Sequence, residues 1–244
     1  MSLRLDKLLA NLGYGSRREI QELVRAGRVR LNEVRLTDAA EKVSAEARAD
    51  LRVDGEVLDP PAGLVLMLNK PLGMTCSHKE EGPLVHDVLP ERWRRRDPAI
   101  SSVGRLDKDT TGLLLLTDDG ALLHKIIAPR THVAKRYQVE LARPLRGDEA
   151  EIFAAGTLML HGEAEPLRPG LLEVATPTRA ALTVTEGRYH QVRRMFAAVG
   201  NHVLGLHRDR IGGLTLPDDL APGDYRLLDE AARATLTNSA AEAG

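Results

Sequence analysis

Two consecutive prolines, Pro60 and Pro61, are the feature that most constrains how this chain can fold. Proline fixes its own φ and has no backbone N–H, so neither a helix nor a central strand continues through the sequence DPPAG at residues 59–63. This stretch therefore reads as a linker, and 244 residues are enough for a small and a medium-sized domain around it. The predicted parts are a small domain over 1–60, a larger domain over 61–232 and a flexible tail over 233–244.

The charge of the first domain is unevenly distributed. Residues 1–35 hold eight basic and four acidic side chains, whereas residues 36–62 hold three basic and seven acidic ones. The net charge of the whole chain is only −1 and its pI is about 6.7, so nucleic-acid binding would depend on a local basic patch. Another charged segment, residues 83–99, contains ERWRRRD and is either a solvated helix or an RNA contact.

The first domain reads as two helices followed by short strands. The leucines of RLDKLLANL recur at helical spacing and predict the first helix. Ser16 and Glu19 have the spacing of a capping box, in which each side chain satisfies a free backbone N–H of the other residue, and they predict the start of the second helix. RVRLN and ADLRVDG alternate as short strands do. Four arginines would share an exposed helical face, either solvated or in contact with phosphates: Arg17, Arg18, Arg25 and Arg28.

The second domain starts with LVLML, a continuous apolar run that predicts a buried strand. Pro71 and Gly73 in the following NKPLG predict a turn. The remaining strands and helices intermix without the regular order of a parallel βαβ fold, which predicts an α+β domain with a mixed, mostly antiparallel sheet. Further strands are expected at 113–117, 136–142 and 179–187, and helices at 119–128 and 189–199.

Composition excludes several classes of protein. Aromatic residues make up 3% of the chain, too few for a broad platform that stacks many single-stranded bases. The single cysteine, Cys76, cannot form an internal disulfide, which fits a reducing compartment. The apolar runs are too short to cross a bilayer, and the N-terminus lacks the apolar region of a signal peptide. We therefore expect a cytoplasmic protein.

The sequence GRLDKDTTGLLLLTDDG, residues 104–120, contains the acidic residue Asp107 just before a run of leucines. Asp107 and Asp109 resemble half of a calcium loop, but the later ligands and the central glycine are missing. The local sequence alone favours a structural role for Asp107 in a turn before a strand. The chain also contains KRY at 135–137 and EGRYHQVRRM at 186–195. A carboxylate, a tyrosine and several cations would suit covalent chemistry without a cofactor on a phosphate-bearing substrate.

These segments resemble two known families. RLDKLLANLGYGSRREIQELVRAGRVRLN is similar to the S4 RNA-binding domain, a small α/β unit that docks on structured RNA. The blocks NKPLG, GRLDKDTTGLLLLTDDG, KRY, EGRYHQVRRM and LHRDRIGGL follow it in the order found in RsuA-type ribosomal RNA pseudouridine synthases. The resemblance covers nearly the whole chain. It implies an S4 domain followed by a pseudouridine synthase domain.

The resemblance also implies a reaction and its residues. The reaction is the site-specific isomerisation of a uridine to pseudouridine in small-subunit (16S) ribosomal RNA, with the uridine flipped out of its helix. Asp107 would be the catalytic residue, Arg193 its paired cation, and Tyr137 the residue that stacks on the uracil. Arg105 would fill the space left by the flipped uridine. The other residues expected to contact RNA are Lys70, Arg188, Arg194, Arg208 and Arg210, together with Arg17, Arg18 and Arg25.

An isomerisation needs no group donor, so we expect no cofactor and no metal. The expected partner is 16S ribosomal RNA or a small-subunit assembly intermediate. We expect no membrane and no obligate protein partner, and nothing in the sequence requires more than a monomer. Three alternatives remain open at this point: a large-subunit (23S) target, a non-catalytic S4-type RNA-binding assembly factor, and a metal-dependent nuclease or phosphoesterase.

Overall fold

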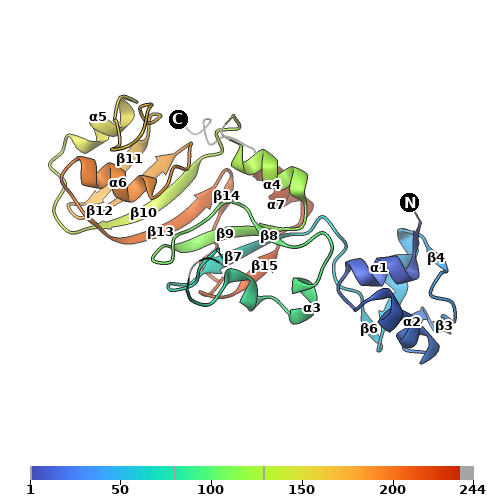
Figure 1. Cartoon of the computed structure of the whole chain (residues 1–244). Helices are drawn as coiled ribbons and strands as arrows, with labels where there is room; N and C mark the ends of the chain where they lie inside the picture. The colour runs from blue at the N-terminus through green and yellow to red at the C-terminus, as the bar shows by residue number, and fades with distance from the viewer. Residues whose placement is uncertain (1, 78, 80, 129, 237–244) are drawn as a thin grey trace. The chain divides into compact units, whose positions relative to one another are not determined.

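The computed structural model describes residues 2–77, 79, 81–128 and 130–236 (Figure 1). Its contacts divide the described chain into two compact units. The first unit contains the chain up to Leu64 together with Leu89–Ser101 and Thr117–Asp119, and the second contains the other described residues. The two predicted domains, 1–60 and 61–232, remain a prediction, but the segment 89–101 packs with the first unit although it follows the prolines.

The described part of the first unit contains two core helices, a further short α-helix and two small sheets. The capping box of Ser16 and Glu19 is confirmed: Ser16 N donates to Glu19 Oε2 at 2.6 Å and Glu19 N donates to Ser16 Oγ at 3.3 Å. Apolar residues of both helices and of the strands form its core. Its main elements are α1 (Leu5–Asn11), α2 (Arg17–Arg25), β2 (Val29–Leu31), β3 (Val34–Arg35), β5 (Leu51–Val53), β6 (Glu56–Val57) and α3 (Glu91–Arg94), and β1 (Leu3–Arg4) pairs with β4 (Lys42–Val43).

The proline segment is held in place within the first unit. Asp59 accepts a hydrogen bond from Arg92 Nη2 at 2.9 Å, and the carbonyl of Pro60 accepts one from Arg96 Nη2 at 2.9 Å. Arg96 also pairs with Asp118 at 3.0 Å, and both side chains are only 1% exposed. Two arginines of the charged segment 83–99 thus anchor the prolines, and residues 59–63 are not the free linker that the sequence suggested.

The second unit is built on one sheet to which nine strands of the described chain belong. The neighbours follow the order β11-β12-β10-β13-β9-β7-β15, and β14 and β8 pair with β13 and β9. The pairing of β13 with β9 is parallel, whereas β10 pairs antiparallel with β12 and β13, as do β11 with β12, β13 with β14 and β15 with β7. The predicted α+β class with a mixed, mostly antiparallel sheet is confirmed. The strands are β7 (Val65–Lys70), β8 (Ser101–Ser102), β9 (Thr111–Thr117), β10 (Lys135–Leu141), β11 (Leu171–Thr176), β12 (Arg179–Val184), β13 (Val203–Ile211), β14 (Leu214–Thr215) and β15 (Tyr225–Leu227).

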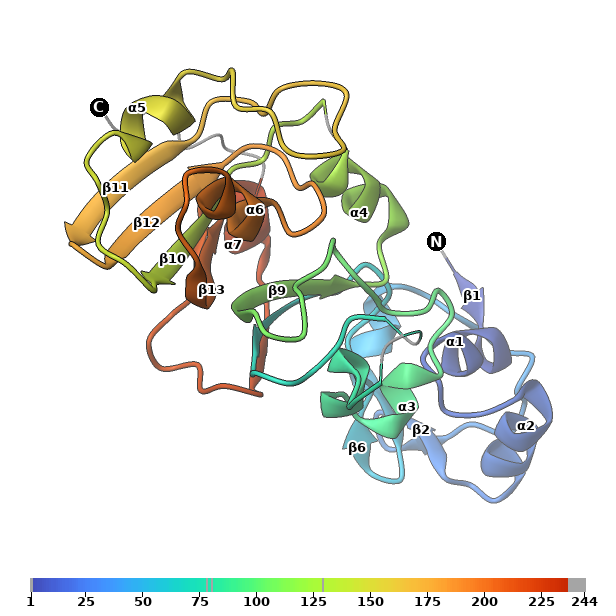
Figure 2. The ribbon, with the colours of Figure 1, turned by 60° about the vertical axis from the view of Figure 1, so that its left-hand side comes forward.

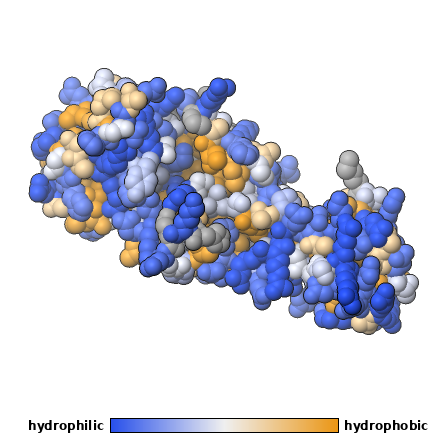
Figure 3. Space-filling view, viewed as in Figure 1, coloured by the Kyte–Doolittle hydropathy of each residue, from blue (hydrophilic) through white to orange (hydrophobic). Residues whose placement is uncertain are grey.

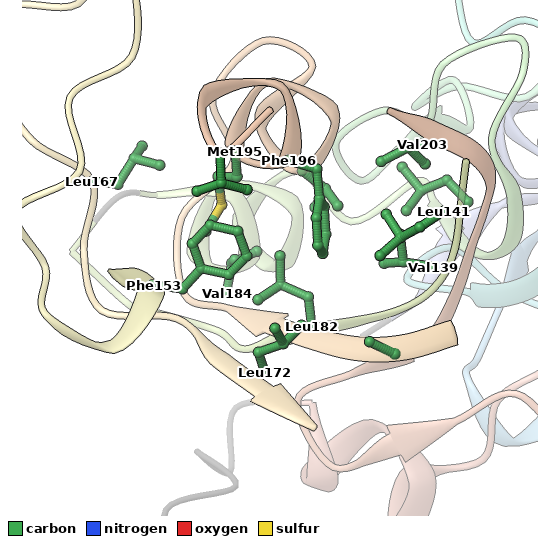
Figure 4. Packing of buried hydrophobic residues seen from close by; sticks show 14 of the residues in the cluster. Val139, Leu141, Phe153, Leu167, Leu172, Leu182, Val184, Met195, Phe196 and Val203 are labelled. Carbon is green, nitrogen blue, oxygen red and sulfur yellow. The ribbon is translucent and has the colours of Figure 1, made fainter. Parts of the chain in front are cut away.

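Helices cover the two halves of this sheet. Helices α5 (Glu149–Ala154) and α6 (Gln191–Ala198) lie over strands β10 to β13 (Figure 2). Figure 4 shows Phe153 of α5 and Phe196 of α6 above Leu182 of β12. The two phenyl rings meet edge to face with their centroids 5.2 Å apart. Aliphatic residues of β7 and β9 form a second core with Ile126 of α4 (Gly120–Ile127).

The helix at the C-terminal end of the described chain continues past residue 233, where the predicted flexible tail begins. Helix α7 spans Glu230–Thr235, and Leu236 after it is fully buried in the core around β7 and β9. The predicted flexibility of residues 233–236 is therefore wrong, because Leu236 has an apolar partner surface. Residues 237–244 lie outside the described residues. Within the described chain, no helix is long and apolar enough to cross a membrane. The visible surface of both units is largely hydrophilic (Figure 3).

Candidate active site

One cavity of the second unit gathers most of the residues that the sequence singled out for chemistry. Its volume is about 1110 Å³. Lys70 and Arg194 do not line it, and the arginines of α2 belong to the first unit. The predicted site residues that line the cavity are Asp107, Tyr137, Arg193, Arg105, Arg188 and Arg208.

The loop that carries Asp107 lies between β8 and β9, and hydrogen bonds to its backbone hold it in place. Thr110 N donates to the carbonyl of Asp107 at 3.0 Å. The carbonyl of Thr110 in turn accepts a hydrogen bond from Lys70 Nζ at 2.8 Å, and Lys70 is fully buried at the end of β7. The prediction that Lys70 contacts RNA is therefore wrong: its ammonium group holds the loop that carries Asp107 and does not reach the surface.

Asp107 has a different partner from the one we predicted. His190 Nε2 lies 3.3 Å from Asp107 Oδ1. His190 is the N-cap of α6 and adopts the left-handed conformation, with φ 46° and ψ 35°, which few residues tolerate. The helix N-terminus also favours a negative charge. The carboxylate of Asp107 is 29% exposed, so a ligand in the cavity can reach it.

Arg193, which we predicted to pair with Asp107, contacts its neighbour Asp109. Arg193 Nη2 lies 2.8 Å from Asp109 Oδ2 and donates to the Asp109 carbonyl at 3.1 Å. Arg193 Nη1 donates to the carbonyl of Val203 at 3.0 Å. The two carboxylates of the loop therefore have separate partners on α6, because His190 at the helix start reaches Asp107 and Arg193, one turn later, reaches Asp109.

Tyr137 and Arg208 face each other across the pairing of β10 with β13. Arg208 Cζ lies 5.8 Å from the centroid of the Tyr137 ring, and Arg208 Nη1 donates to the tyrosine hydroxyl at 3.4 Å. Arg208 is 3% exposed and its Nε donates to the carbonyl of Leu113 at 2.8 Å. The prediction that Arg208 is a surface phosphate contact is therefore wrong, and its observed contact is with Tyr137.

Gly112 allows β9 to pair closely with β13 at the position of Arg208. It has φ 102° and pairs in register with Arg208 across β9 and β13. A Cβ atom at this position would lie 2.3 Å from the carbonyl oxygen of Arg208, closer than any real contact. A glycine is therefore required where the strand that follows the Asp107 loop meets the strand that carries Arg208.

Lys135 also lines the cavity, although the sequence gave no reason to single it out within KRY. It lies two residues before Tyr137 on β10, and its ammonium group donates to the carbonyl of Val133 at 3.0 Å. Burial, together with the nearby charge of Arg208, lowers the pKa of Lys135 from 10.5 to about 8. The cavity therefore contains an amine whose charge changes close to physiological pH.

Two further arginines at or near the cavity, Arg188 and Arg194, have acidic partners. Arg188 lies 3.2 Å from Glu186 and 3.4 Å from Glu163, and Arg194 lies 2.7 Å from the other oxygen of Glu163. Arg105 is exposed at the cavity. Arg210 is half-buried on β13.

The arginines predicted on α2 divide into two groups. Arg17, Arg18 and Arg25 are exposed on the helix, as expected. Arg28 lies beyond its end and is bound by Asp54, with an Nε–Oδ1 distance of 2.6 Å. Arg28 therefore does not belong to the helical face on which we placed it.

Known proteins match this chain over most of its length. A model of the RNA pseudouridylate synthase family matches residues 64–198, and a model of the S4 domain matches residues 3–48. The chain is 47% identical over 232 residues to the ribosomal small subunit pseudouridine synthase A of Escherichia coli K12, which covers 93% of this chain and 97% of that protein. It is 41% identical over 228 residues to the protein of the same name from Vibrio cholerae, with coverage of 93% and 96%.

A solved structure matches the fold as well. A crystal structure of a pseudouridylate synthase superimposes with a TM-score of 0.67 at 38% sequence identity, and the match covers 96% of this chain and all of that one. Together with the family matches, it confirms the resemblance that the sequence blocks indicated. The chain therefore belongs to the RNA pseudouridylate synthase family and carries an S4 domain near its N-terminus.

Proposed function

We infer that this chain is an isomerase that converts a uridine of small-subunit (16S) ribosomal RNA to pseudouridine. The single observation that carries this inference is the full-length identity of 47% to an enzyme named for the ribosomal small subunit. The cavity supports it, because Asp107, Tyr137 and several basic residues line one space large enough for a nucleotide. We assign RNA binding to the S4 domain over residues 1–60 and catalysis to residues 61–232.

In the proposed mechanism, Asp107 acts on the ribose of a flipped uridine. The bond between C1′ and N1 breaks, either by attack of the carboxylate on C1′ or through a glycal. The uracil rotates and a bond forms between C1′ and C5. In the first route this breaks the bond between Asp107 and C1′, and in the second the proton removed from C2′ returns to the sugar. C5 then loses its proton and N1 gains one. Every atom of the uridine is kept, so the step needs no donor, oxidant or reductant.

The neighbours of Asp107 fit this role. Its carboxylate lies beside the imidazole of His190, the N-cap of α6, which can donate a hydrogen bond to it. Tyr137 would stack on the uracil while Arg208 holds the tyrosine ring and hydroxyl from behind. Arg193 would position the loop through Asp109. Arg105 would occupy the space of the flipped base.

We also propose the form of the substrate, the surface that contacts it, the oligomeric state and the compartment. The substrate is 16S ribosomal RNA, either free or in an assembling small subunit, and the exposed arginines of α2, Arg17, Arg18 and Arg25, contact its backbone. The chain acts as a monomer in the cytoplasm.

The test is primer extension on carbodiimide-treated ribosomal RNA, which stops at pseudouridine. Cells with the wild-type chain, without it, and with Asp107→Ala are compared. The expected result is one stop in small-subunit RNA that requires Asp107. A stop in large-subunit RNA would keep the chemistry and overturn the substrate, and no stop that depends on the protein would leave a non-catalytic RNA-binding factor.

A further inference from the structure

Tyr189 has no part in the chemistry described above, yet it lines the same cavity and is 75% exposed. The other aromatic side chains, all of them in the described part of the chain, are buried or half-buried. A large aromatic surface that is left in water at a binding cavity indicates a partner that covers it.

The tyrosine ring is held in a defined orientation. It stacks on the ring of His190, with the centroids 3.9 Å apart and an angle of 16° between the planes. The carbonyl of Tyr189 accepts a hydrogen bond from Arg194 Nη1 at 3.1 Å, and Arg194 is itself fixed by Glu163. One face of the ring is thus covered by the histidine, and a partner that binds the exposed ring finds it already ordered.

The stack leads directly to the catalytic carboxylate. His190 is the residue whose Nε2 lies 3.3 Å from Asp107. A flat group that stacks on the exposed face of Tyr189 would therefore extend the stack of Tyr189 on His190, and His190 in turn contacts Asp107. In an RNA substrate with a flipped uridine at Asp107, the group that can stack there is the base of an adjacent unpaired nucleotide.

The charges around Tyr189 favour a base over a phosphate. The neighbouring Arg188 is bound by Glu186 and Glu163, and its guanidinium also donates to the carbonyls of Glu165 and Pro166 at 2.7 Å. Because these acidic groups compensate the charge of Arg188, a partner at this place meets the π face of the Tyr189 ring and not a free positive charge. We propose that Tyr189 is a stacking platform for the unpaired base next to the target uridine in the RNA substrate.

This inference rests on the proposed function, because it assumes that the substrate is an RNA whose uridine reaches Asp107. Stacking of one base on an aromatic side chain typically contributes enough that its removal weakens binding about 5- to 150-fold. Since stacking uses the ring and not the hydroxyl, Tyr189→Phe should bind as the wild type does, whereas Tyr189→Ala should lose this affinity.

The experiment is a double-mutant cycle on a ribosomal RNA fragment that spans the modified uridine. Wild type, Tyr189→Ala and Tyr189→Phe are titrated with the intact fragment and with fragments that lack the base on the 5′ or the 3′ side of the target. The expected result is that one abasic fragment binds wild type about 5- to 150-fold more weakly and binds Tyr189→Ala with no further loss. The matched control is Leu171→Ala, which removes a side chain of 61% exposure from β11 outside the cavity and should not change affinity.

Three outcomes would overturn the platform: unchanged affinity of Tyr189→Ala, losses that simply add for both abasic fragments, or Tyr189→Phe as weak as Tyr189→Ala. Pseudouridine formation by the wild type is measured on the same fragment. If it is absent while the cycle shows coupling, the proposed function fails and the platform stands. If it is present while the losses are additive, the platform alone fails.

Discussion

The cavity is lined by two groups of residues that differ in how the fold holds them. The loop group, Asp107, Tyr189 and His190, lies on segments before β9 and before α6, and its side chains are partly or largely exposed. The strand group, Lys135, Tyr137 and Arg208, lies on β10 and β13; Arg208 is buried and the other two are half-buried. The difference indicates that the loop residues supply the reacting carboxylate and an exposed contact surface, whereas the strand residues fix the shape and charge of the cavity wall on which Tyr137 would meet the uracil.

The largest effect is expected from the loop group. Asp107→Asn keeps the size of the side chain but removes the carboxylate that acts on the ribose, so pseudouridine formation should fall at least about a thousandfold in a single-turnover assay. RNA affinity should stay close to that of the wild type, because the substituted residue is one neutral side chain in a cavity with several cations. Asp109→Asn is the comparison at the second carboxylate of the loop, which contacts Arg193, and it should lose far less activity. Substantial residual activity of Asp107→Asn would contradict the assignment of chemistry to the loop group.

The strand group should control stability instead. Gly112→Ala would place a Cβ 2.3 Å from the carbonyl of Arg208 at a positive φ, so the pairing of β9 with β13 would have to open. We expect the free energy of unfolding to fall by about 3–4 kcal/mol, as for other severe backbone clashes in a core. Denaturant unfolding measures this change.

Gly223→Ala is the matched control for this clash. Gly223 also has a positive φ, of 94°, but no atom lies within 4 Å of the Cβ that alanine would add. Its cost should therefore be only that of the left-handed backbone, about 1–2 kcal/mol. If the free energy of unfolding fell equally in the two variants, the clash with the Arg208 carbonyl would contribute nothing to the loss of stability.

A smaller effect is expected from the buried amine of the strand group. The pKa of Lys135 is about 8 in the folded protein and ordinarily 10.5. Below pH 8 the lysine is charged in both the folded and the unfolded state, and the full cost of burying its charge is present. Between pH 8 and 10.5 the unfolded chain binds more protons, so this contribution makes stability rise with pH. The depression corresponds to at most roughly 3 kcal/mol.

Lys135→Met should therefore stabilise the protein at pH 7, and the difference from wild type should shrink to near zero by pH 10.5. Urea unfolding at several pH values gives this difference. Lys125→Met, at an exposed lysine of α4, serves as the control and should give a flat difference. A difference for Lys135→Met that does not change with pH would mean that Lys135 is not a charge held in a desolvated site.

Features set by neighbouring residues could be predicted from the sequence, whereas contacts between distant segments could not. Local patterns predicted the capping box of Ser16 and the buried strand that became β7, because caps and apolar runs act within a few residues. The motif blocks pointed to Asp107, Tyr137 and Arg193, which line the cavity, but also to Lys70 and Arg194, which do not. The sequence could not show that Lys70 is buried under Thr110, or that Arg96 reaches Asp118, because both contacts join segments more than twenty residues apart. These long-range contacts depend on the completed fold.

The partner of Asp107 was missed for a conformational reason, and it supplies the last prediction. His190 reaches Asp107 only because its backbone is left-handed, and helical periodicity carries no such information. Asparagine tolerates this conformation, so His190→Asn should keep the backbone and lose the imidazole. We expect kcat to fall about tenfold, the result of a carboxylate that is less well oriented, with a smaller change in KM.

His190→Gly separates this effect from strain, because glycine adopts the same φ freely and also lacks the imidazole. If the imidazole orients Asp107, the two variants should lose the same fraction of kcat in steady-state assays on the ribosomal RNA fragment. A glycine variant as active as the wild type would show that the imidazole is dispensable. The loop group would then contain one essential carboxylate, and His190 would serve only as the support on which Tyr189 stacks.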